Sequence, residues 1–522
     1  MKHLKFDHHF IDNLPADPVT HTVRRQVVEA CYSFVSPKST ATPKLLIHSP
    51  EVAEMLDLSE TDCSSDVFTQ VFSGNALLDG MKPYAMCYGG HQFGNWAGQL
   101  GDGRAMTIAD VINKKGERWS LQLKGAGETP YSRTADGLAV LRSSIREFLC
   151  SEAMFHLDVP TTRALSLCAT GDEVWRDMFY DGNAEYEQGA VVCRVAPSFL
   201  RFGNFEIFNS RGDSKTLQTL LDFTIRTYFS HLIENDTIHT DTYTRWFAEV
   251  CDTTKTMIIH WQRVGFVHGV MNTDNMSILG LTIDYGPYGW LEDYNPDWTP
   301  NTTDAANHRY AFGKQAHIAH WNLMKLAQAI APLFEDTTPL QDTLNNYAPA
   351  YKKSWQAMMQ QKLGLNTFDK ALVEQLMNNL EQMEADMTIF FRKLADIEIE
   401  DDAEQCLSKV HDAFYPTDKL EDKAASVWTS WFENYVQHIK KDGVDARKTS
   451  MNQVNPKYVL RNYLAQLVID KANEGDLSML HELFEVLKKP YDEQPEHETK
   501  YAQKRPDWAK EKAGCSMLSC SS

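Results

Sequence analysis

Two short polar segments between His268 and Gly286 contain the residue types that hold divalent metal ions beside phosphate groups. Asn275 lies near the end of the first segment, and Asp284 opens the Asp-Tyr-Gly sequence that follows. An amide oxygen and a carboxylate suit Mg²⁺ or Mn²⁺, which take their remaining ligands from phosphate oxygens and water. The sequence therefore predicts a nucleotide site with Mg²⁺ or Mn²⁺, in which Asn275 and Asp284 are the metal ligands.

The order of these residues is similar to that of a protein-kinase catalytic loop, but the kinase base is missing. A kinase loop reads His-Arg-Asp-x-x-x-x-Asn, and its aspartate accepts the proton of the substrate hydroxyl. With His268 placed first, the asparagine falls at Asn275 and the base falls at Val270, which accepts no proton. Asp274 is the nearby carboxylate that could replace it. The order predicts nucleotide and metal binding with altered chemistry, although each segment alone is also typical of a polar turn.

The neighbouring segments indicate how these ligands are positioned. Residues 216–265 have the apolar spacing of helices that lead into the loop. The run from Ser277 to Ile283 predicts a tight hairpin that brings the two metal ligands together. The polar segment from Pro287 to Tyr310 occupies the place of a kinase activation segment. We expect a protein substrate or a regulator to act there.

A glycine-rich stretch precedes these segments and is expected to approach phosphate groups. Six glycines between residues 89 and 103 leave the backbone free of side chains, as a phosphate cradle requires. Gly101 and Gly103 end the stretch, and Arg104 adds a cation. The stretch is neither a Walker A motif nor a regular Gly-x-Gly-x-x-Gly. Because a glycine-rich loop alone is more often just a turn, the argument depends on the strand that follows.

That strand carries a lysine at its end. Trp119 to Lys124 alternates apolar and polar residues, and the spacing from Leu138 to Leu157 predicts a helix. In kinases, such a lysine binds nucleotide phosphates and pairs with a glutamate on the next helix. Glu147 is the favoured partner of Lys124, and Glu152 is the competitor. An exposed lysine at the end of a strand is the simpler alternative, which the neighbouring segments disfavour.

Further candidates for nucleotide binding lie on either side of this helix. Asp136 and Gly137 precede it and either bind the ribose or base or cap the helix. Arg194, within a predicted strand from Val191 to Ala196, and Arg201 are candidates for phosphate binding. A guanidinium group has a shape that matches phosphate oxygens. Two arginines seven residues apart are common, however, so their spacing alone is a weak indication of phosphate binding.

Charge and composition restrict the possible partners and compartment. The chain has 522 residues and a net charge of −20, which disfavours nucleic acid and anionic membranes as partners. No stretch approaches the ~18 apolar residues of a membrane span, and residues 1–20 lack the apolar core of a secretion signal. The ten cysteines form no Cys-x-x-Cys pair. Most are therefore expected to be reduced and buried in a cytoplasmic protein.

Patterning divides the chain into four regions. We predict an N-terminal extension at 1–83, a nucleotide-binding core at 84–315, a helical region at 316–514 and a tail at 515–522. The tail carries Cys515 and Cys520 on a segment that is expected to be exposed and flexible. Its thiols could form a disulfide with each other or reach the active site, and inert tail cysteines are the simpler alternative.

Together these segments resemble the selenoprotein O family of protein adenylyltransferases, over most of the chain. The segments that carry the resemblance are Tyr88–Gly94, Trp96–Ala105, Val140–Leu149, Pro160–Ala164, His268–Ser277 and Ser519–Ser522. The resemblance implies an α+β pseudokinase fold, in which a protein-kinase-like bilobal core has an N-terminal extension and a mostly helical C-terminal region. Cys520 stands where eukaryotic members carry selenocysteine, so the chain is similar to the cysteine-containing bacterial type.

The resemblance also implies an activity and roles for individual residues. Members of the family transfer AMP from ATP to Ser, Thr or Tyr hydroxyls of protein substrates, release pyrophosphate, and bind ATP in the reverse orientation to a kinase. The implied roles are Asp274 as base, Glu147 as partner of Lys124, and Asn275 with Asp284 on the metal. The implied nucleotide contacts are Gly101, Gly103, Arg104, Lys124, Asp136, Gly137, Arg194, Arg201 and Asp284.

The chain departs from the family pattern at two places. Ala135 and Leu138 flank Asp136-Gly137 where the family usually has Gly and Arg, and Pro300 stands where it often has a cysteine. The second departure argues against a disulfide between the tail and the 300 region, so our hypothesis is a Cys515–Cys520 pair. Two rival functions stay open: a kinase-type phosphotransferase that uses Asp274, and an inactive ATP-binding scaffold.

Overall fold

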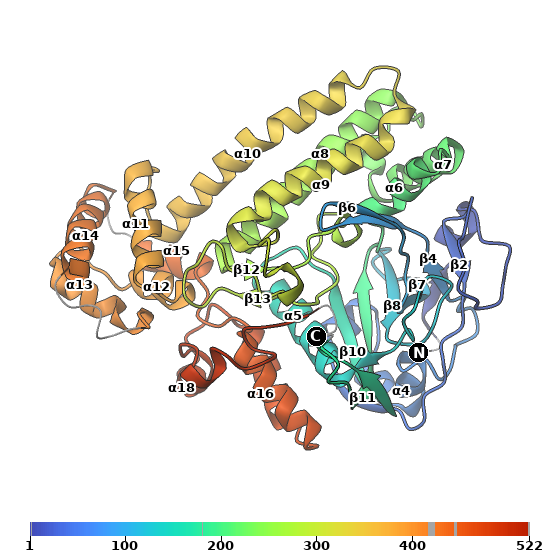
Figure 1. Ribbon diagram of the computed structural model, residues 1–522, viewed down its shortest axis with the longest axis horizontal. Helices are drawn as coiled ribbons and strands as arrows, with labels where there is room; N and C mark the ends of the chain where they lie inside the picture. Colours follow the sequence, from blue (N-terminus) through green and yellow to red (C-terminus); the bar gives the residue numbers. More distant parts are fainter. Residues whose placement is uncertain (2, 180, 416–422, 443–445, 520–522) are drawn as a thin grey trace.

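A large antiparallel sheet forms the part of the fold that positions the predicted site (Figure 1). The computed structural model describes residues 1, 3–179, 181–415, 423–442 and 446–519. Among these residues the sheet has nine strands, in the order β2-β4-β7-β8-β11-β10-β3, with β1 beside β7 and β9 beside β11. The strands are β1 Lys5–Asp7, β2 Tyr32–Phe34, β3 Lys44–His48, β4 Tyr84–Met86, β7 Ala105–Ile112, β8 Arg118–Lys124, β9 Ala139–Val140, β10 Arg163–Arg176 and β11 Glu185–Ala196.

The register of the central strands brings three polar side chains to one face of the sheet. Lys124 lies opposite Val192 of β11 and Ala105 of β7, and Arg194 lies opposite Gln122. Because side chains alternate between the faces of a strand, Gln122 and Lys124 point to the same side, and Arg194 joins them. The predicted strands that carry Lys124 and Arg194 are therefore confirmed and adjacent.

Strands from the first 83 residues complete the sheet. β1 pairs with β7, β2 pairs with β4, and β3 forms the edge beside β10. Four short helices lie in this part of the chain: α1 His9–Asn13, α2 Pro50–Met55, α3 Glu60–Cys63 and α4 Asp66–Phe72. The region predicted to be an extension thus contributes strands to the sheet that holds the site.

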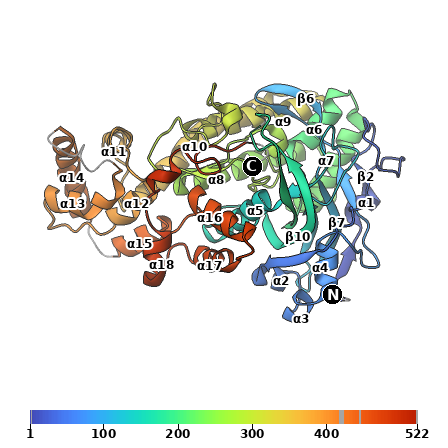
Figure 2. The same ribbon diagram turned by 60° about the horizontal axis from the view of Figure 1, so that its bottom comes forward.

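A buried helix packs on the face of the sheet that carries Lys124. This helix, α5, spans Leu141–His156 and contacts β10 and β11. It begins later than the predicted Leu138, because Ala139 and Val140 pair with β11 as β9. In Figure 2 the later helices α16 Asn462–Asn473 and α17 Ser478–Leu487 lie against α5, which is consistent with their contacts.

Within the described residues, the regular elements from residue 316 onward are helices, as the sequence predicted for residues 316–514 (Figure 1). Long helices α8, α9 and α10 run together, and α11–α15 form a group around a second hydrophobic core, which includes Phe390, Trp428 and Trp431. Val267, Leu291 and Phe312 of the central region also belong to this core. No helix within the described ranges is both long enough and apolar enough to cross a membrane. The helices not yet given are α6 Phe202–Ser210, α7 Ser214–Tyr228, α8 Thr240–Val264, α9 Gln315–Ile330, α10 Thr338–Leu363, α11 Lys370–Gln382, α12 Met387–Leu394, α13 Ala403–Val410, α14 Lys423–Asp442, α15 Arg447–Val454 and α18 Pro495–Tyr501.

The hairpin predicted between the two metal-ligand segments is wrong. Ser277 bridges to Arg201 and Thr282 bridges to Thr161, so the two arms pair with other parts of the chain and not with each other. A turn closed by the hydrogen bond from the Gly280 amide to the Ser277 carbonyl, 3.2 Å long, joins them. The compact connection between the metal-ligand segments is therefore held by residues from distant positions.

The C-terminal tail also differs from the prediction. Leu518 pairs with the 300 region: its amide donates to the Pro300 carbonyl at 3.0 Å, and its carbonyl accepts from the Thr302 amide at 2.8 Å. Cys515 is a buried free thiol whose pKa burial raises to about 11, so the exposed, flexible thiol that we predicted is wrong at this position. Cys520 lies outside the described residues, and so does the hypothetical Cys515–Cys520 disulfide.

Candidate active site

A cavity of about 340 Å³ lies at the end of β8 and contains most of the predicted site residues. Its volume is within the range of small-ligand pockets. The glycine-rich loop forms one wall, and the segment from Val270 to Pro287 forms another. The predicted residues that line it are Gly101, Gly103, Arg104, Lys124, Arg194, Asp274, Asn275 and Asp284.

The loop from Gly101 to Arg104 is shaped by close packing against Tyr131. Gly101 has φ +76°, and a Cβ atom there would lie 2.3 Å from the Tyr131 ring. A Cβ atom at Gly103 would lie 2.9 Å from the Tyr131 carbonyl oxygen. Between them, the buried carboxylate of Asp102 accepts a hydrogen bond from the Met86 amide at 2.9 Å. The two glycines thus let the loop follow a buried path along the cavity.

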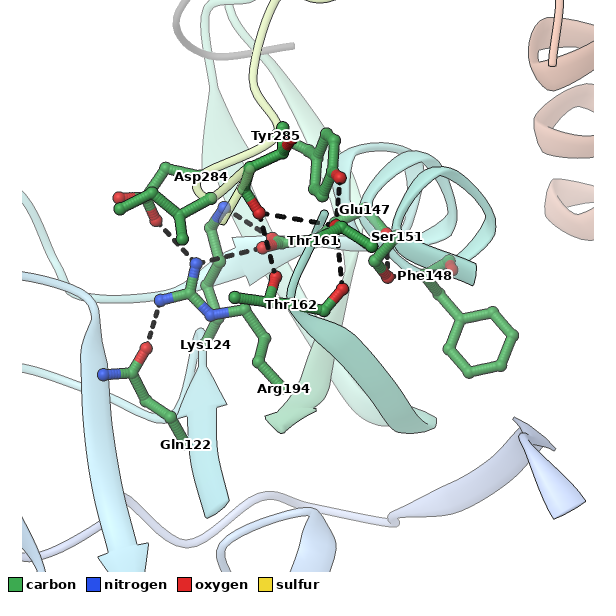
Figure 3. Close-up of polar contacts among 12 residues, drawn as sticks. Gln122, Lys124, Glu147, Phe148, Ser151, Thr161, Thr162, Arg194, Asp284 and Tyr285 are labelled. Carbon is green, nitrogen blue, oxygen red and sulfur yellow. Dashed lines mark hydrogen bonds and ion pairs between the residues drawn. The ribbon is translucent and has the colours of Figure 1, made fainter. Parts of the chain in front are cut away.

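Lys124, Glu147 and Arg194 form a buried charge network (Figure 3). Lys124 Nζ lies 2.5 Å from Glu147 Oε2, so the ion pair predicted between the strand and the helix is present. Arg194 Nη1 donates to Glu147 Oε1 at 3.0 Å and to Asp284 Oδ1 at 2.6 Å. Burial lowers the pKa of Lys124 to about 8, although the carboxylate of Glu147 opposes that change. An anionic ligand in the cavity would favour the protonated lysine.

Asp284 lies between two arginines. Its backbone is in the left-handed region, with φ +57°, and its second carboxylate oxygen accepts a hydrogen bond from Arg201. Burial would raise the pKa of Asp284, but Arg201, Arg194 and Lys124 outweigh burial and hold the pKa well below its ordinary value. The carboxylate is therefore ionised at neutral pH, as a metal ligand must be.

The side-chain amide nitrogen of Asn275 is bound within its own loop. Its Nδ2 donates to the Val270 carbonyl at 2.9 Å, and both residues line the cavity together with Asp284. No cluster of three or more His, Cys, Asp or Glu side chains suited to a metal occurs in the part of the chain that the structure describes. Mg²⁺ usually binds proteins through one or two side-chain oxygens plus phosphates. Asn275 and Asp284 therefore fit a metal ion that shares its ligands with a nucleotide.

Asp274 is a buried carboxylate with spare hydrogen-bonding capacity. Its Oδ2 accepts a hydrogen bond from Gln92 Nε2 at 3.2 Å, whereas its Oδ1 is shielded from solvent and has no partner among the described residues. Burial raises the pKa of Asp274 to about 7. A carboxyl group with a pKa near the working pH is suited to accept a proton from a hydroxyl group.

A small hairpin that the sequence did not predict covers Asp274. Its strands are β5 Gly89–Gln92 and β6 Asn95–Gln99. The His91 amide donates to Thr273 Oγ1 at 2.7 Å, and the Phe93 amide donates to Asn272 Oδ1 at 3.3 Å. A Cβ atom at Gly90 would lie only 2.6 Å from Asp274 Oδ1. The signal for this role in the sequence is the Gly89-Gly90 pair, because a side chain at Gly90 would collide with Asp274.

Four of the residues predicted to bind the nucleotide or to support Lys124 lie outside the cavity lining or behind it. Glu147 contacts the cavity through Lys124, and Arg201 does so through Asp284 and through a 2.8 Å hydrogen bond to the Asp274 carbonyl. Asp136 and Gly137 follow the lining residue Ala135 without lining the cavity. Both carboxylate oxygens of Asp136 instead accept 2.8 Å hydrogen bonds from Arg176, which the sequence did not indicate as a partner.

Comparison with known proteins gives matches over nearly the whole chain. A family model described as protein adenylyltransferase SelO matches residues 19–488. The protein nucleotidyltransferase YdiU of Rhodopirellula baltica is 56% identical over 99% of both chains. The proteins of the same name from an Azoarcus species and from Aromatoleum aromaticum are 57% and 55% identical, each over 100% of both chains.

Proposed function

Because this chain belongs to the protein adenylyltransferase SelO family and is a protein nucleotidyltransferase, we propose that it transfers AMP from ATP to Ser, Thr or Tyr hydroxyls of proteins. The observation that carries the choice of AMP over phosphate is the replacement of the kinase base by Val270, with the buried carboxylate of Asp274 in the same cavity. ATP would then lie reversed relative to a kinase, with its α-phosphorus toward Asp274.

The residues that line the cavity have complementary tasks in this reaction. Lys124, Arg104 and Arg194 bind the phosphate oxygens, and Glu147 positions Lys124. The carboxylate of Asp274, which lines the cavity, accepts the proton of the acceptor hydroxyl. The hydroxyl oxygen forms a bond to the α-phosphorus as the bond from that phosphorus to pyrophosphate breaks. In such transfers, the positioning of the reactants and the fixed charges of the site provide most of the rate enhancement.

Asn275 and Asp284 would hold Mg²⁺ or Mn²⁺ beside the phosphates. The metal supplies positive charge that offsets the charge of the triphosphate. Arg194 and Arg201 keep the carboxylate of Asp284 ionised and fix its direction. Asp136 and Gly137 would contact ATP where it extends past Ala135, and Arg176 would then have to share Asp136.

The arrangement of the sheet and helices supports a protein-kinase-like interpretation of the core. In this proposal, the antiparallel sheet with α5 corresponds to the nucleotide-binding lobe, and the helices from α6 to α9 correspond to the second lobe. Lys124 on a strand and Glu147 on the following helix are the pair that such a lobe requires.

Labelled ATP distinguishes the proposed activity from its rivals. The protein is incubated with ATP labelled at either the α or the γ position, and labelled protein is then counted. We expect label on protein from the α position only, and an increase in intact mass equal to that of AMP. Label from the γ position alone would indicate a kinase, and bound ATP without label from either position would indicate an inactive scaffold.

The activity should depend on pH through Asp274. Its pKa is raised to about 7, and the ionised form is the one that accepts a proton. We therefore expect kcat/KM for AMP transfer to fall about tenfold per pH unit below about 7, because kcat/KM reports groups of the free enzyme. It should fall again above about 8, where Lys124 loses the proton with which it binds the phosphates. The profile is measured with α-labelled ATP between about pH 5 and 9. A flat profile across this range would exclude Asp274 as the base.

Replacement of Gly90 with alanine should slow the chemical step. The added methyl group would lie 2.6 Å from Asp274 Oδ1 and would push the carboxylate away from the acceptor. A displacement of about 1 Å can cost on the order of a hundredfold in rate, so we expect a loss in kcat of that size. Affinity for ATP, measured by calorimetry, should stay unchanged. Alanine at Gly475, which has φ +86° and no atom within 4 Å of the new Cβ atom, strains the backbone without touching Asp274 and should leave kcat unchanged.

A further inference from the structure

A second hollow, of about 340 Å³, lies directly beyond the tip of the β5–β6 hairpin. We call it the basic hollow, and its lining residues are Phe93, Asn307, Arg309, Lys314, His317 and Ile318. Three of these residues are basic and none is acidic, although the whole chain has a net charge of −20. A local excess of positive charge on an acidic protein favours an anionic partner at this place.

Hydrogen bonds fix the basic hollow at a constant position relative to Asp274. Gln92, which donates to Asp274, is followed directly by Phe93, which lines the hollow. The Phe93 amide donates to the Tyr310 hydroxyl at 2.9 Å, and that hydroxyl donates to Asn272 Oδ1 at 2.5 Å. The hairpin tip, the wall of the hollow and the segment that carries Asp274 are therefore held together. A group bound in the hollow would fix the distance of its own chain from the carboxylate.

The basic side chains of the hollow are positioned by neighbouring residues, and no acidic side chain lines the hollow to neutralise them. The Arg309 guanidinium stacks on Trp321, 4.7 Å from the ring centre, and its Nε has no hydrogen-bond partner within the described residues. The backbone amide of Arg309 is held by the buried Asp304 carboxylate at 3.0 Å. Lys314 Nζ makes a long hydrogen bond of 3.5 Å to the Asn307 carbonyl. The Lys314 ammonium therefore keeps hydrogen-bond donors for a ligand, and the Arg309 guanidinium adds positive charge beside it.

We propose that the basic hollow binds a carboxylate side chain of the acceptor protein, close in sequence to the hydroxyl that receives AMP. This inference rests on the proposed function, because it needs a protein acceptor at Asp274. Gln92, the last residue of β5, lines the cavity with Asp274, and Phe93, in the turn that follows with φ +49°, lines the hollow. An extended acceptor spans about 3.3 Å per residue. An acidic residue within about four positions of the hydroxyl can therefore reach the hollow.

The proposal is tested with synthetic acceptor peptides. Each peptide has a single threonine in a neutral alanine and glutamine background, and one aspartate is placed at each position up to about four residues on either side. AMP transfer from α-labelled ATP gives kcat and the KM for the peptide. We expect aspartate at one favoured position to lower KM about fivefold relative to the neutral peptide, the effect of one well-placed charge pair, with little change in kcat.

Reversal of one charge in the hollow provides the decisive variant. Lys314→Glu should abolish the preference for aspartate and create a preference for lysine at the same peptide position. Lys115→Glu is the control, because it makes the same charge change at an exposed position in the turn between β7 and β8. This turn lies at the opposite ends of the two strands from Ala105 and Lys124, so the variant should keep the peptide preference of the unchanged enzyme. ATP affinity, measured for each variant, checks that the fold and the cavity are preserved.

The outcomes separate the two levels of the proposal. Equal KM values at every aspartate position would overturn it, as would an unaltered preference in Lys314→Glu. So would an enzyme that labels proteins but labels no peptide. If α-labelled ATP labels no protein at all, the proposed function itself fails.

Discussion

Replacement of Asp284 with asparagine is expected to reduce AMP transfer by more than about a hundredfold, the usual cost of removing a fixed charge from the transition state. The substitution keeps the shape of the side chain but removes the charge that a divalent metal ion requires. It also leaves the buried guanidinium groups of Arg194 and Arg201 without their shared carboxylate. Loss of one partner of a buried charge pair costs about 3 kcal/mol, so the melting temperature should fall as well.

Transfer is measured with α-labelled ATP, and stability by thermal denaturation of the same samples. The same chemical change at the exposed Asp79 provides a control that should alter neither quantity. Assays below the melting temperature of the variant separate the catalytic loss from unfolding. Undiminished AMP transfer by the folded Asp284→Asn variant would show that Asp284 is not a metal ligand.

Replacement of Asp274 with asparagine should lower kcat by about 10² to 10⁴, the range for loss of a general base. The amide retains the size of the carboxylate and can still accept the hydrogen bond from Gln92, so the hairpin should stay in place. Affinity for ATP should be equal or higher, because a negative charge has left the cavity that holds the triphosphate.

Calorimetric titration with ATP and single-turnover transfer separate these two effects. The expected pattern is ATP bound with at least normal affinity and transferred slowly. A normal single-turnover rate would show that the acceptor hydroxyl loses its proton elsewhere. Weak ATP binding would instead indicate that Asp274 contributes to nucleotide affinity.

Local patterns predicted the parts of the site that depend on neighbouring residues in the chain. The alternation from Trp119 to Lys124 identified a strand, and the spacing around Glu147 identified a helix. Kinase chemistry then indicated that their charged ends should meet, and the ion pair between them is present. The sequence could not show that Arg194 joins the pair, because this contact depends on the register between β8 and β11.

Features that depend on distant parts of the chain were missed. The residues flanking the Ser277–Gly280 turn pair with Arg201 and Thr161, and no local pattern records such partners. Arg176 engages Asp136 from another strand, so a residue predicted to contact nucleotide already has a protein partner. The hairpin over Asp274 is not predicted, because glycines between residues 89 and 103 are equally typical of a phosphate-binding loop.

The last residues of the chain have a consequence for laboratory work. Leu518 is bonded to Pro300 and Thr302, and the intervening Asn301 donates from Nδ2 to the Gly269 carbonyl at 3.0 Å, one residue beyond His268. A proteolytic cut or a fusion that displaces Leu518 would break these hydrogen bonds, which lie next to the loop that carries the candidate site residues. Recombinant preparations with and without such a fusion should be compared before kinetic constants are assigned to the enzyme.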